Sequence, residues 1–163
     1  KICGYVHEQG KPSVILMNKW DLVEKDTHTI NKFNDKLKED LKFMDYFKPL
    51  YISAKTGQRV EKVLEAVENV YEHASYRVST GLLNDLVLDS VRMNEPPSVN
   101  GKRLKIMYAT QAEVCPPTFI MFVNEAELMH FSYKRYLENC IRKAFDFSGT
   151  PIKSVVREQE KDE

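Results

Sequence analysis

The sequence predicts a truncated α/β half, built on a parallel sheet, followed by an α+β sandwich. Over residues 1–75, short continuous apolar runs alternate with amphipathic stretches, which is typical of strands buried on both faces and of their crossover helices. From about residue 76 the order changes to helix, strand, strand, helix pair, strand. Pro96-Pro97 and Asn100-Gly101 break the chain after the first helix of that second part. We therefore expect two domains, residues 1–75 and 76–163.

Four elements are expected in the first domain. Residues 13–17 and 49–53 are apolar runs that predict two buried strands. Residues 27–41 and 59–73 show helical periodicity. A strand–helix–strand–helix order with short joints implies parallel strands with right-handed crossovers.

The two helices of this half differ in what marks them. Asp26 or Thr27 is a natural N-cap for the first helix. The second helix carries an apolar stripe along one side. A sheet of only two strands would leave one of its edges and one helix-facing surface without a partner. We therefore expect further strands upstream of Lys1, which itself opens in the middle of an element. The stripe consists of Val60, Val63, Leu64, Val67 and Val70.

The second domain is expected to place helices on one face of a three-stranded sheet. Its 80–93 helix is amphipathic, and the strands on either side of the Cys115-Pro116-Pro117 segment are expected to pair. In chain order, the predicted elements are a helix over 80–93, strands over 105–109 and 118–123, a helical turn over 125–129, a helix over 132–145 and a strand over 151–156.

Composition excludes several classes of protein. The formal net charge is zero, with 24 basic and 24 acidic residues, so global charge gives no sign of nucleic acid. Residues 77–157 carry 11 basic and 8 acidic side chains, and the acidic tail 158–163 offsets this excess. Three cysteines without metal-ligand spacing argue against disulfides and zinc and favour a reducing cytoplasm. No apolar run is long enough to span a membrane, and no signal peptide is evident.

The segment Asn18-Lys19-Trp20-Asp21 follows the first predicted strand, where α/β folds place their ligands. The carboxylate of Asp21 can accept hydrogen bonds from N1–H and the exocyclic amine of guanine, which adenine cannot provide. The stem of Lys19 can cover the base, and the amide of Asn18 can reach N7. Trp20 is expected to pack beside the loop. A surface turn remains the alternative for such a short motif.

Ser53-Ala54-Lys55 follows the second predicted strand in the same way. The segment resembles the Ser-Ala-Lys segment of GTPases, which implies a backbone N–H to guanine O6 and a lysine that flanks the base. An ordinary loop is the alternative for the tripeptide alone. Because both motifs follow neighbouring strands, together they predict a guanine site made of Asn18, Lys19, Asp21, Ser53, Ala54 and Lys55.

The groups that handle phosphate are missing from the sequence. It contains no Gly-x-x-x-x-Gly-Lys-Ser/Thr loop and no Asp-x-x-Gly segment placed for the γ-phosphate and Mg²⁺. We expect no catalytic and no metal-binding residues, and therefore no GTP hydrolysis by this chain alone.

Nearly the whole chain resembles the C-terminal part of the EngA (Der) family of double GTPases. The resemblance includes Asn18 to Asp21, Gly4-Tyr5 and Tyr46, and it is most specific in the second domain. The segments there are Asn84-Asp85, 101–106, Tyr108-Ala109-Thr110-Gln111, Pro116-Pro117-Thr118-Phe119, 127–133, Tyr136-Leu137-Glu138-Asn139, Ile141-Arg142, Ala144-Phe145 and Gly149-Thr150-Pro151-Ile152.

Family members carry two GTPase domains in tandem and then a KH-like domain, and they act in maturation of the large ribosomal subunit. The resemblance implies that this chain begins late in the second GTPase domain, after its phosphate loop. It implies GTP or GDP and Mg²⁺ as cofactors of the parent protein. The implied partners are a guanine nucleotide, the large subunit with its ribosomal RNA, and the parent's own GTPase domains.

A KH domain grips single-stranded RNA with a Gly-x-x-Gly turn, but the corresponding segment here, 129–132, has no glycine. Two alternatives follow for this domain: it contacts RNA through another face, or it docks against GTPase domains. Four basic residues at helical spacing are candidates for RNA contact, with a solvated face as the alternative: Lys134, Arg135, Arg142 and Lys143. The aromatics Tyr108, Phe119 and Phe122 are expected to pack in the core rather than to stack on bases.

A second interpretation differs in class. The chain could be a stand-alone RNA-binding or scaffold protein that keeps a degenerate α/β half. A phosphate loop upstream of Lys1 would favour the GTPase interpretation.

Overall fold

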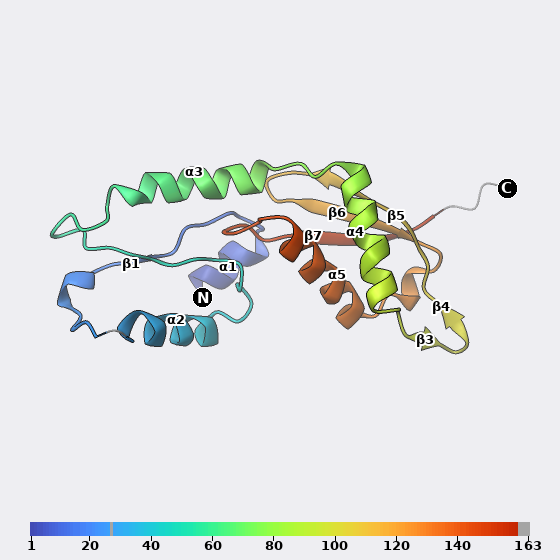
Figure 1. Ribbon diagram of the computed structural model, residues 1–163, viewed down its shortest axis with the longest axis horizontal. Helices are drawn as coiled ribbons and strands as arrows, with labels where there is room; N and C mark the ends of the chain where they lie inside the picture. The colour runs from blue at the N-terminus through green and yellow to red at the C-terminus, as the bar shows by residue number, and fades with distance from the viewer. Residues whose placement is uncertain (27, 160–163) are drawn as a thin grey trace. The chain divides into compact units, whose positions relative to one another are not determined.

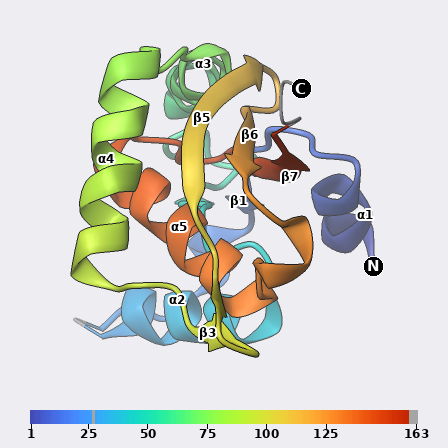
Figure 2. The ribbon, with the colours of Figure 1, turned by 90° about the vertical axis from the view of Figure 1, so that its right-hand side faces the viewer.

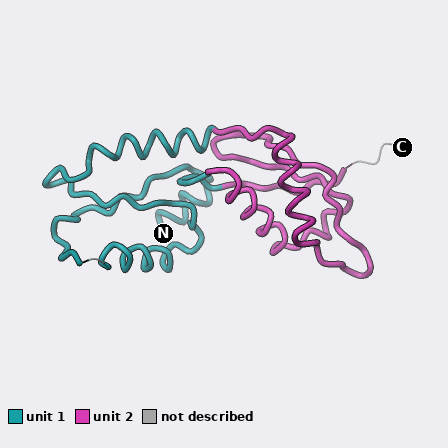
Figure 3. Tube along the Cα trace, in the orientation of Figure 1, with its two compact units in different colours: residues 1–75, 147–151 teal, residues 76–146, 152–163 magenta. Residues whose placement is uncertain are grey.

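The chain forms two compact units in the computed structural model, which describes residues 1–26 and 28–159. Figure 3 colours the two units separately. The chain leaves the second unit for the first at residue 147 and returns at residue 152, which the predicted boundary after residue 75 did not anticipate. Unit 1 comprises residues 1–75 and 147–151, and unit 2 comprises residues 76–146 and 152–163.

Unit 1 is built around a parallel pair of very short strands (Figure 1). The register pairs Leu16 with Leu50 and Met17 with Tyr51. The elements in chain order are α1 (Ile2–Glu8), β1 (Leu16–Met17), the 3₁₀ turn η1 (Trp20–Leu22), α2 (Thr29–Asp40), β2 (Leu50–Tyr51) and α3 (Lys62–Ser75).

Differences from the predicted elements have local causes. Only the last part of the 13–17 run pairs with β2, because the Ser13 N–H donates to the Gly149 carbonyl at 2.8 Å instead. Helix α1 was not predicted, since seven residues without a buried side chain show no usable periodicity. Helix α2 begins two residues late, and its predicted cap Thr27 lies outside the described residues. Asp26 accepts hydrogen bonds from the His28 N–H and the Thr29 hydroxyl in the turn before α2.

The apolar stripe predicted on α3 divides into two lines. Val63 and Val70 are half-buried and Ala74 is fully buried, so one line faces the interior of unit 1. A second line, consisting of Leu64, Val67 and Tyr71, is exposed, with Leu64 at 73%, and so is Val60, which precedes the helix. A two-stranded sheet is too narrow to cover both lines of the helix.

Residues 147–151 complete the interior of unit 1. Phe147 is 1% exposed and Thr150 is fully buried. Gly149 is held from both sides, since its N–H donates to the Tyr46 carbonyl at 2.8 Å and its carbonyl accepts from Ser13. Its φ is +79°, and a Cβ at this position would lie 2.3 Å from a methyl group of Val70. A side chain is therefore excluded by both backbone conformation and space.

Unit 2 has the predicted α+β architecture, with the strand order β5–β6–β7. β5 is antiparallel to β6, and β6 is parallel to β7. An additional hairpin, not predicted, turns at Asn100-Gly101, whose φ values of 50° and 77° suit the type I′ turn favoured by Asn-Gly. The elements are α4 (Thr80–Met93), β3 (Ser98–Val99), β4 (Lys102–Arg103), β5 (Ile106–Glu113), β6 (Thr118–Val123), the 3₁₀ turn η2 (Ala126–Leu128), α5 (Phe131–Ala144) and β7 (Lys153–Glu158).

Helices α4 and α5 cover one face of this sheet (Figure 2). Alternate residues of β6 supply the covered face, since Phe119, Met121 and Val123 have no exposed surface. The buried residues Leu83 and Val87 of α4 and Leu137 and Ile141 of α5 supply the helix side of the same core.

Two amide side chains attach the start of α4 to β5. Asn84 bonds the backbone of Ala109 twice, donating to its carbonyl at 2.9 Å and accepting from its N–H at 2.8 Å. Gln111, 5% exposed, accepts from the Val78 N–H at 2.7 Å and donates to the Tyr76 carbonyl at 3.0 Å. Gln111 is buried and Asn84 is half-buried, and replacing either amide is costly because it leaves backbone groups unpaired.

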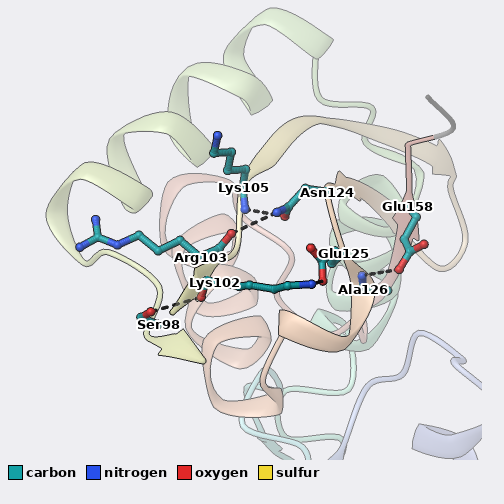
Figure 4. A network of polar contacts seen from close by, with 8 residues as sticks. All are labelled: Ser98, Lys102, Arg103, Lys105, Asn124, Glu125, Ala126 and Glu158. Atoms are coloured by element: carbon teal, nitrogen blue, oxygen red, sulfur yellow. Dashed lines mark hydrogen bonds and ion pairs between the residues drawn. The ribbon is translucent and has the colours of Figure 1, made fainter. Parts of the chain in front are cut away.

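A polar network ties the hairpin to the end of β6 (Figure 4). The Asn124 side chain accepts from the Lys105 N–H at 2.7 Å and donates to the Arg103 carbonyl at 3.1 Å. Lys102 pairs with Glu125 at 2.9 Å, and the carboxylate raises the pKa of Lys102. These ion-paired groups are largely exposed to solvent, which weakens their attraction. The hydrogen bonds of the Asn124 side chain therefore hold the hairpin more firmly than the ion pair does.

We expect Gly149→Ala to destabilise unit 1 by about 2–4 kcal/mol, because left-handed backbone strain adds to the clash with Val70. Gly57→Ala is the matched control. Gly57 has the same left-handed conformation, with φ +78°, and nothing within 4 Å of its Cβ position, so strain alone should cost about 1–2 kcal/mol. Urea unfolding followed by the fluorescence of Trp20 reports on unit 1. Equal losses in the two variants would show that the close approach to Val70 is unimportant.

Candidate functional site

The candidate site is built by the two loops that follow β1 and β2. Because the strands are parallel, both loops leave the sheet at the same edge. The Ile52 N–H donates to the Met17 carbonyl at 2.9 Å, and the Trp20 N–H donates to the Ile52 carbonyl at 3.0 Å. The first loop is thus hydrogen-bonded to the start of the second.

Asn18 joins the two predicted motifs directly. Its Oδ1 accepts from the N–H of Lys19 at 2.7 Å and from the N–H of Ala54, 36 residues further along the chain, at 3.0 Å. Lys19 has a left-handed backbone, with φ 63°, and this tight turn starts the 3₁₀ segment that carries Asp21. A short amide side chain at position 18 therefore fixes the geometry of both loops.

Asp21 and Ser53 form the second link between the loops. The Ser53 hydroxyl donates to Asp21 Oδ1 at 2.5 Å, and the same hydroxyl accepts from the Thr56 N–H at 3.2 Å. The hydrogen bond from Ser53 is the main cause that lowers the pKa of Asp21 below 3.8, with partial desolvation opposing it and Lys55 and Lys25 adding to it. Since the folded pKa is depressed, the ionised carboxylate is present at all pH values above 3.8 and is lost only as the pH falls through the lower folded value.

The Trp20 side chain faces away from the site. It is 3% exposed and packs against Tyr51 at 4.4 Å and Phe33 at 5.4 Å between ring centroids. Burial of this ring anchors η1 to the interior, as the sequence predicted. Asp21, the next residue, remains at the surface.

The loop after β2 is closed by a residue that the sequence analysis did not identify. The carbonyl of Gln58 accepts from the Ser53 N–H at 3.1 Å, and the Gly57 N–H donates to the Ser53 carbonyl at 2.9 Å. Gly57, in its left-handed conformation, allows the chain to turn back. A Thr-Gly dipeptide after the Ser-Ala-Lys segment was the available signal for this turn.

To bind a guanine base, the carboxylate of Asp21 and the N–H of Ala54 would each have to accommodate it beside an existing hydrogen-bond partner. An ionised carboxylate has about four acceptor positions, so Asp21 can accept from Ser53 and still take two donors from a base edge. The Ala54 N–H, however, already donates to Asn18 Oδ1. A base oxygen at this position has either to share the Ala54 N–H with Asn18 Oδ1 or to displace Asn18 Oδ1 from it.

The four basic candidates on α5 do not form one line. Tyr133, Leu137 and Ile141 mark the buried side of the helix. Arg135 and Arg142, seven residues apart, lie on nearly the same line on the opposite side. Lys134 and Lys143 lie on the two flanks of that line, where Lys134 is half-buried and Lys143 is exposed.

The segment 129–132, in which α5 begins, is capped by a side chain and contains no glycine. His130 Nδ1 accepts from the Ser132 N–H at 3.3 Å and lies 2.7 Å from the Ser132 hydroxyl. Phe131 projects into solvent, 74% exposed. A backbone covered in this way offers less room for phosphates than a Gly-x-x-Gly turn does.

The described residues, 1–26 and 28–159, hold neither a metal-binding cluster nor a membrane-spanning helix. Within these ranges no cluster of three or more His, Cys, Asp or Glu side chains is arranged to hold a metal ion. Over the same part of the chain, every helix is too short or too polar to cross a membrane.

Fold and site together define the class: a truncated α/β half of a GTPase domain, followed by an α+β KH-like domain. Residues 77–157 match the family model described as the KH-domain-like, C-terminal part of EngA bacterial GTPase enzymes. The chain belongs to the EngA (Der) family.

Relatives support the same assignment along almost the whole chain. The protein named GTPase Der of Ruminiclostridium cellulolyticum is 55% identical over 162 residues, which is 99% of this chain and 37% of the relative. GTPase Der of Desulforamulus reducens is 56% identical over 160 residues, and that of Halalkalibacterium halodurans is 54% identical over 159 residues, each 98% of this chain and 36% of the relative. The chain thus spans 36–37% of the length of these relatives.

Ser53→Ala tests the link between the two loops. We expect the pKa of Asp21 to rise towards its ordinary value of 3.8, because the main cause of its lowering is removed. A carboxyl-detected NMR titration measures this shift. Asp26 is the internal control, since its lowered pKa depends on His28 and Thr29 rather than on Ser53. An unchanged Asp21 titration would show that Ser53 does not hold this carboxylate.

Proposed function

We propose that the loops after β1 and β2 bind the guanine base of GTP or GDP. The observation that carries this proposal is the double link between the motifs, Asn18 to Ala54 and Ser53 to Asp21. It supports a single site in which Asp21 selects guanine, Lys19 and Lys55 flank the base, and the backbone at Ala54 approaches O6. The family match and the relatives named GTPase Der favour the same base.

The chain supplies base recognition without the groups for phosphate chemistry. Positioning and charge stabilisation of the phosphoryl group provide nearly all catalysis in GTPases, and the sequence lacks the phosphate loop and the Asp-x-x-Gly segment that do this. In the parent protein a bound Mg²⁺ would supply charge neutralisation at the nucleotide phosphates, and no residue of this chain is proposed to hold it. We propose that hydrolysis belongs to the parent and that this chain alone is inactive.

The wider function that we propose is maturation of the large ribosomal subunit in the cytoplasm. The KH-like domain would contact ribosomal RNA, and the α/β half would join the rest of its GTPase domain. The exposed line of Leu64, Val67 and Tyr71 on α3, with Val60 just before the helix, supports this second contact, because a larger sheet would cover it. Identity of 54–56% to GTPase Der proteins over 98–99% of the chain speaks against a stand-alone RNA-binding or scaffold protein.

Replacing Asp21 tests the base site. Asp21→Asn should abolish the preference of the chain for GDP over ADP and create a preference for xanthosine diphosphate, since an amide can donate to the C2 carbonyl of xanthine. A charged hydrogen-bond pairing contributes about 1.5–3 kcal/mol, which is roughly a 10- to 150-fold change in affinity. Ligand-observed NMR at millimolar nucleotide suits the weak binding expected without a phosphate loop.

Asp26→Asn, five residues further along the same connection between β1 and α2, is the matched control and should keep the preference for GDP. The same samples should release no inorganic phosphate from GTP above the buffer rate. An unchanged preference in Asp21→Asn would exclude this loop as the base site.

The α5 residues test the RNA contact that we propose. Each phosphate neutralised on a single strand contributes about 0.7 to the slope of log affinity against log salt. Arg135→Gln combined with Arg142→Gln should therefore flatten the slope by roughly 1 to 1.5. Labelled ribosomal RNA is titrated at several salt concentrations, with Lys36→Gln combined with Lys42→Gln as the control of equal charge in unit 1. Equal slopes in wild type and the α5 variant would leave Lys134, Arg135, Arg142 and Lys143 as a solvated face.

A further inference from the structure

The outward face of the β5–β6–β7 sheet is the side of unit 2 that α4 and α5 leave uncovered. The strand registers arrange its side chains in rows that cross the sheet. One row consists of Tyr108, Phe122 and Arg157, and the next consists of Thr110, Ile120 and Val155. These positions alternate with the buried residues of the same strands, such as Phe119 and Met121.

Two aromatic rings form the centre of this face. The rings of Tyr108 and Phe122 are stacked, 4.4 Å apart between centroids and 16° from parallel. Tyr108 is 41% exposed and Phe122 is half-buried, although the sequence predicted both in the core. That prediction was right only for Phe119, because alternation along β6 sends positions 119 and 122 to opposite faces. A preformed ring stack open to solvent is a ready surface for a further aromatic group.

Positive charge lies beside the rings on the edge strand β7. Arg157 continues the row of Tyr108 and Phe122, and Lys153 lies four residues away on the same strand, about 13 Å along it. Both are exposed. The acidic residue in these registers, Glu113, lies in the same row as Lys153, since both pair with Thr118, and this row is the one farthest from the rings, so Arg157 is the cation beside them. Glu158 points to the other face, where it accepts from the Ala126 N–H.

We propose that this outward face binds single-stranded RNA. A base stacks on the Tyr108–Phe122 pair, and the attached phosphates lie along Arg157 and Lys153. Stacking needs a base whose face is free, so single strands bind and duplexes do not. The combination of ring stack and flanking cations matches a nucleotide strand better than it matches an apolar protein segment. The site goes beyond the proposed function, since it lies on the face of the sheet opposite to the one that α4 and α5 cover, whereas the RNA contact under Proposed function is on α5.

Ring-removing variants of the complete chain test this site. Tyr108→Leu and Phe122→Leu keep an apolar side chain but remove the stacking surface. Each should weaken binding of a fluorescein-labelled oligoadenylate decamer, measured by anisotropy at low salt, by about fivefold or more. Tyr108→Phe keeps the ring and should bind as the wild type does. Phe131→Leu removes a more exposed ring, at the first residue of α5, and should also leave binding unchanged.

A second measurement needs no variant. Amide shifts of the ¹⁵N-labelled chain on adding the decamer should map to β5, β6 and β7 around Tyr108, Ile120 and Val155. Shifts confined to α5 would overturn the sheet site while leaving the RNA contact under Proposed function intact. Unchanged affinity in both leucine variants, equal binding of a duplex of the same length, or no RNA binding at all would also overturn it. In the last case a protein segment becomes the occupant of this face.

Discussion

The candidate site depends on the parallel pairing of β1 and β2, although this pairing covers only two residues in each strand. Hydrogen bonds from Leu50 to Ile15 and from Ile52 to Met17 set the register. They bring two loops, 36 residues apart, to one edge of the sheet. Only in this register can Asn18 Oδ1 reach the Ala54 N–H and the Ser53 hydroxyl reach Asp21. A shift of one residue would turn the strand's side chains to the other face and separate these groups.

Unit 1 reaches this geometry with help from a distant part of the chain. Residues 147–151 come from the region that matches the KH-domain-like family model, yet they pack inside unit 1. Gly149 bonds to Ser13, three residues before β1, and to Tyr46, four residues before β2. The segment thus supports the approach to both strands that carry the site. Mutations around Gly149 are expected to affect both units, because the chain passes from one to the other at residues 147 and 152.

The two faces of the sheet in unit 2 carry different kinds of side chain. The covered face is apolar and is attached to α4 by two amides, Asn84 and Gln111, whose hydrogen bonds satisfy backbone groups of Ala109 and Val78. The outward face carries a ring stack and two cations. Family resemblance pointed to Asn84 and Gln111 without giving their role, and the structure shows that both are structural.

The sequence by itself determined the order and type of the main elements, the strand-end positions of both motifs and the family. Periodicity and strand-end placement are local properties, so residues 80–93 were predicted at their exact bounds. Tertiary structure alone decided the rest. Which line of α3 is buried, where residues 147–151 lie, and that Tyr108 and Phe122 face solvent all depend on partners distant in sequence. An apolar side chain favours burial in general, but only the assembled sheet has an uncovered face, and register decides which residues occupy it.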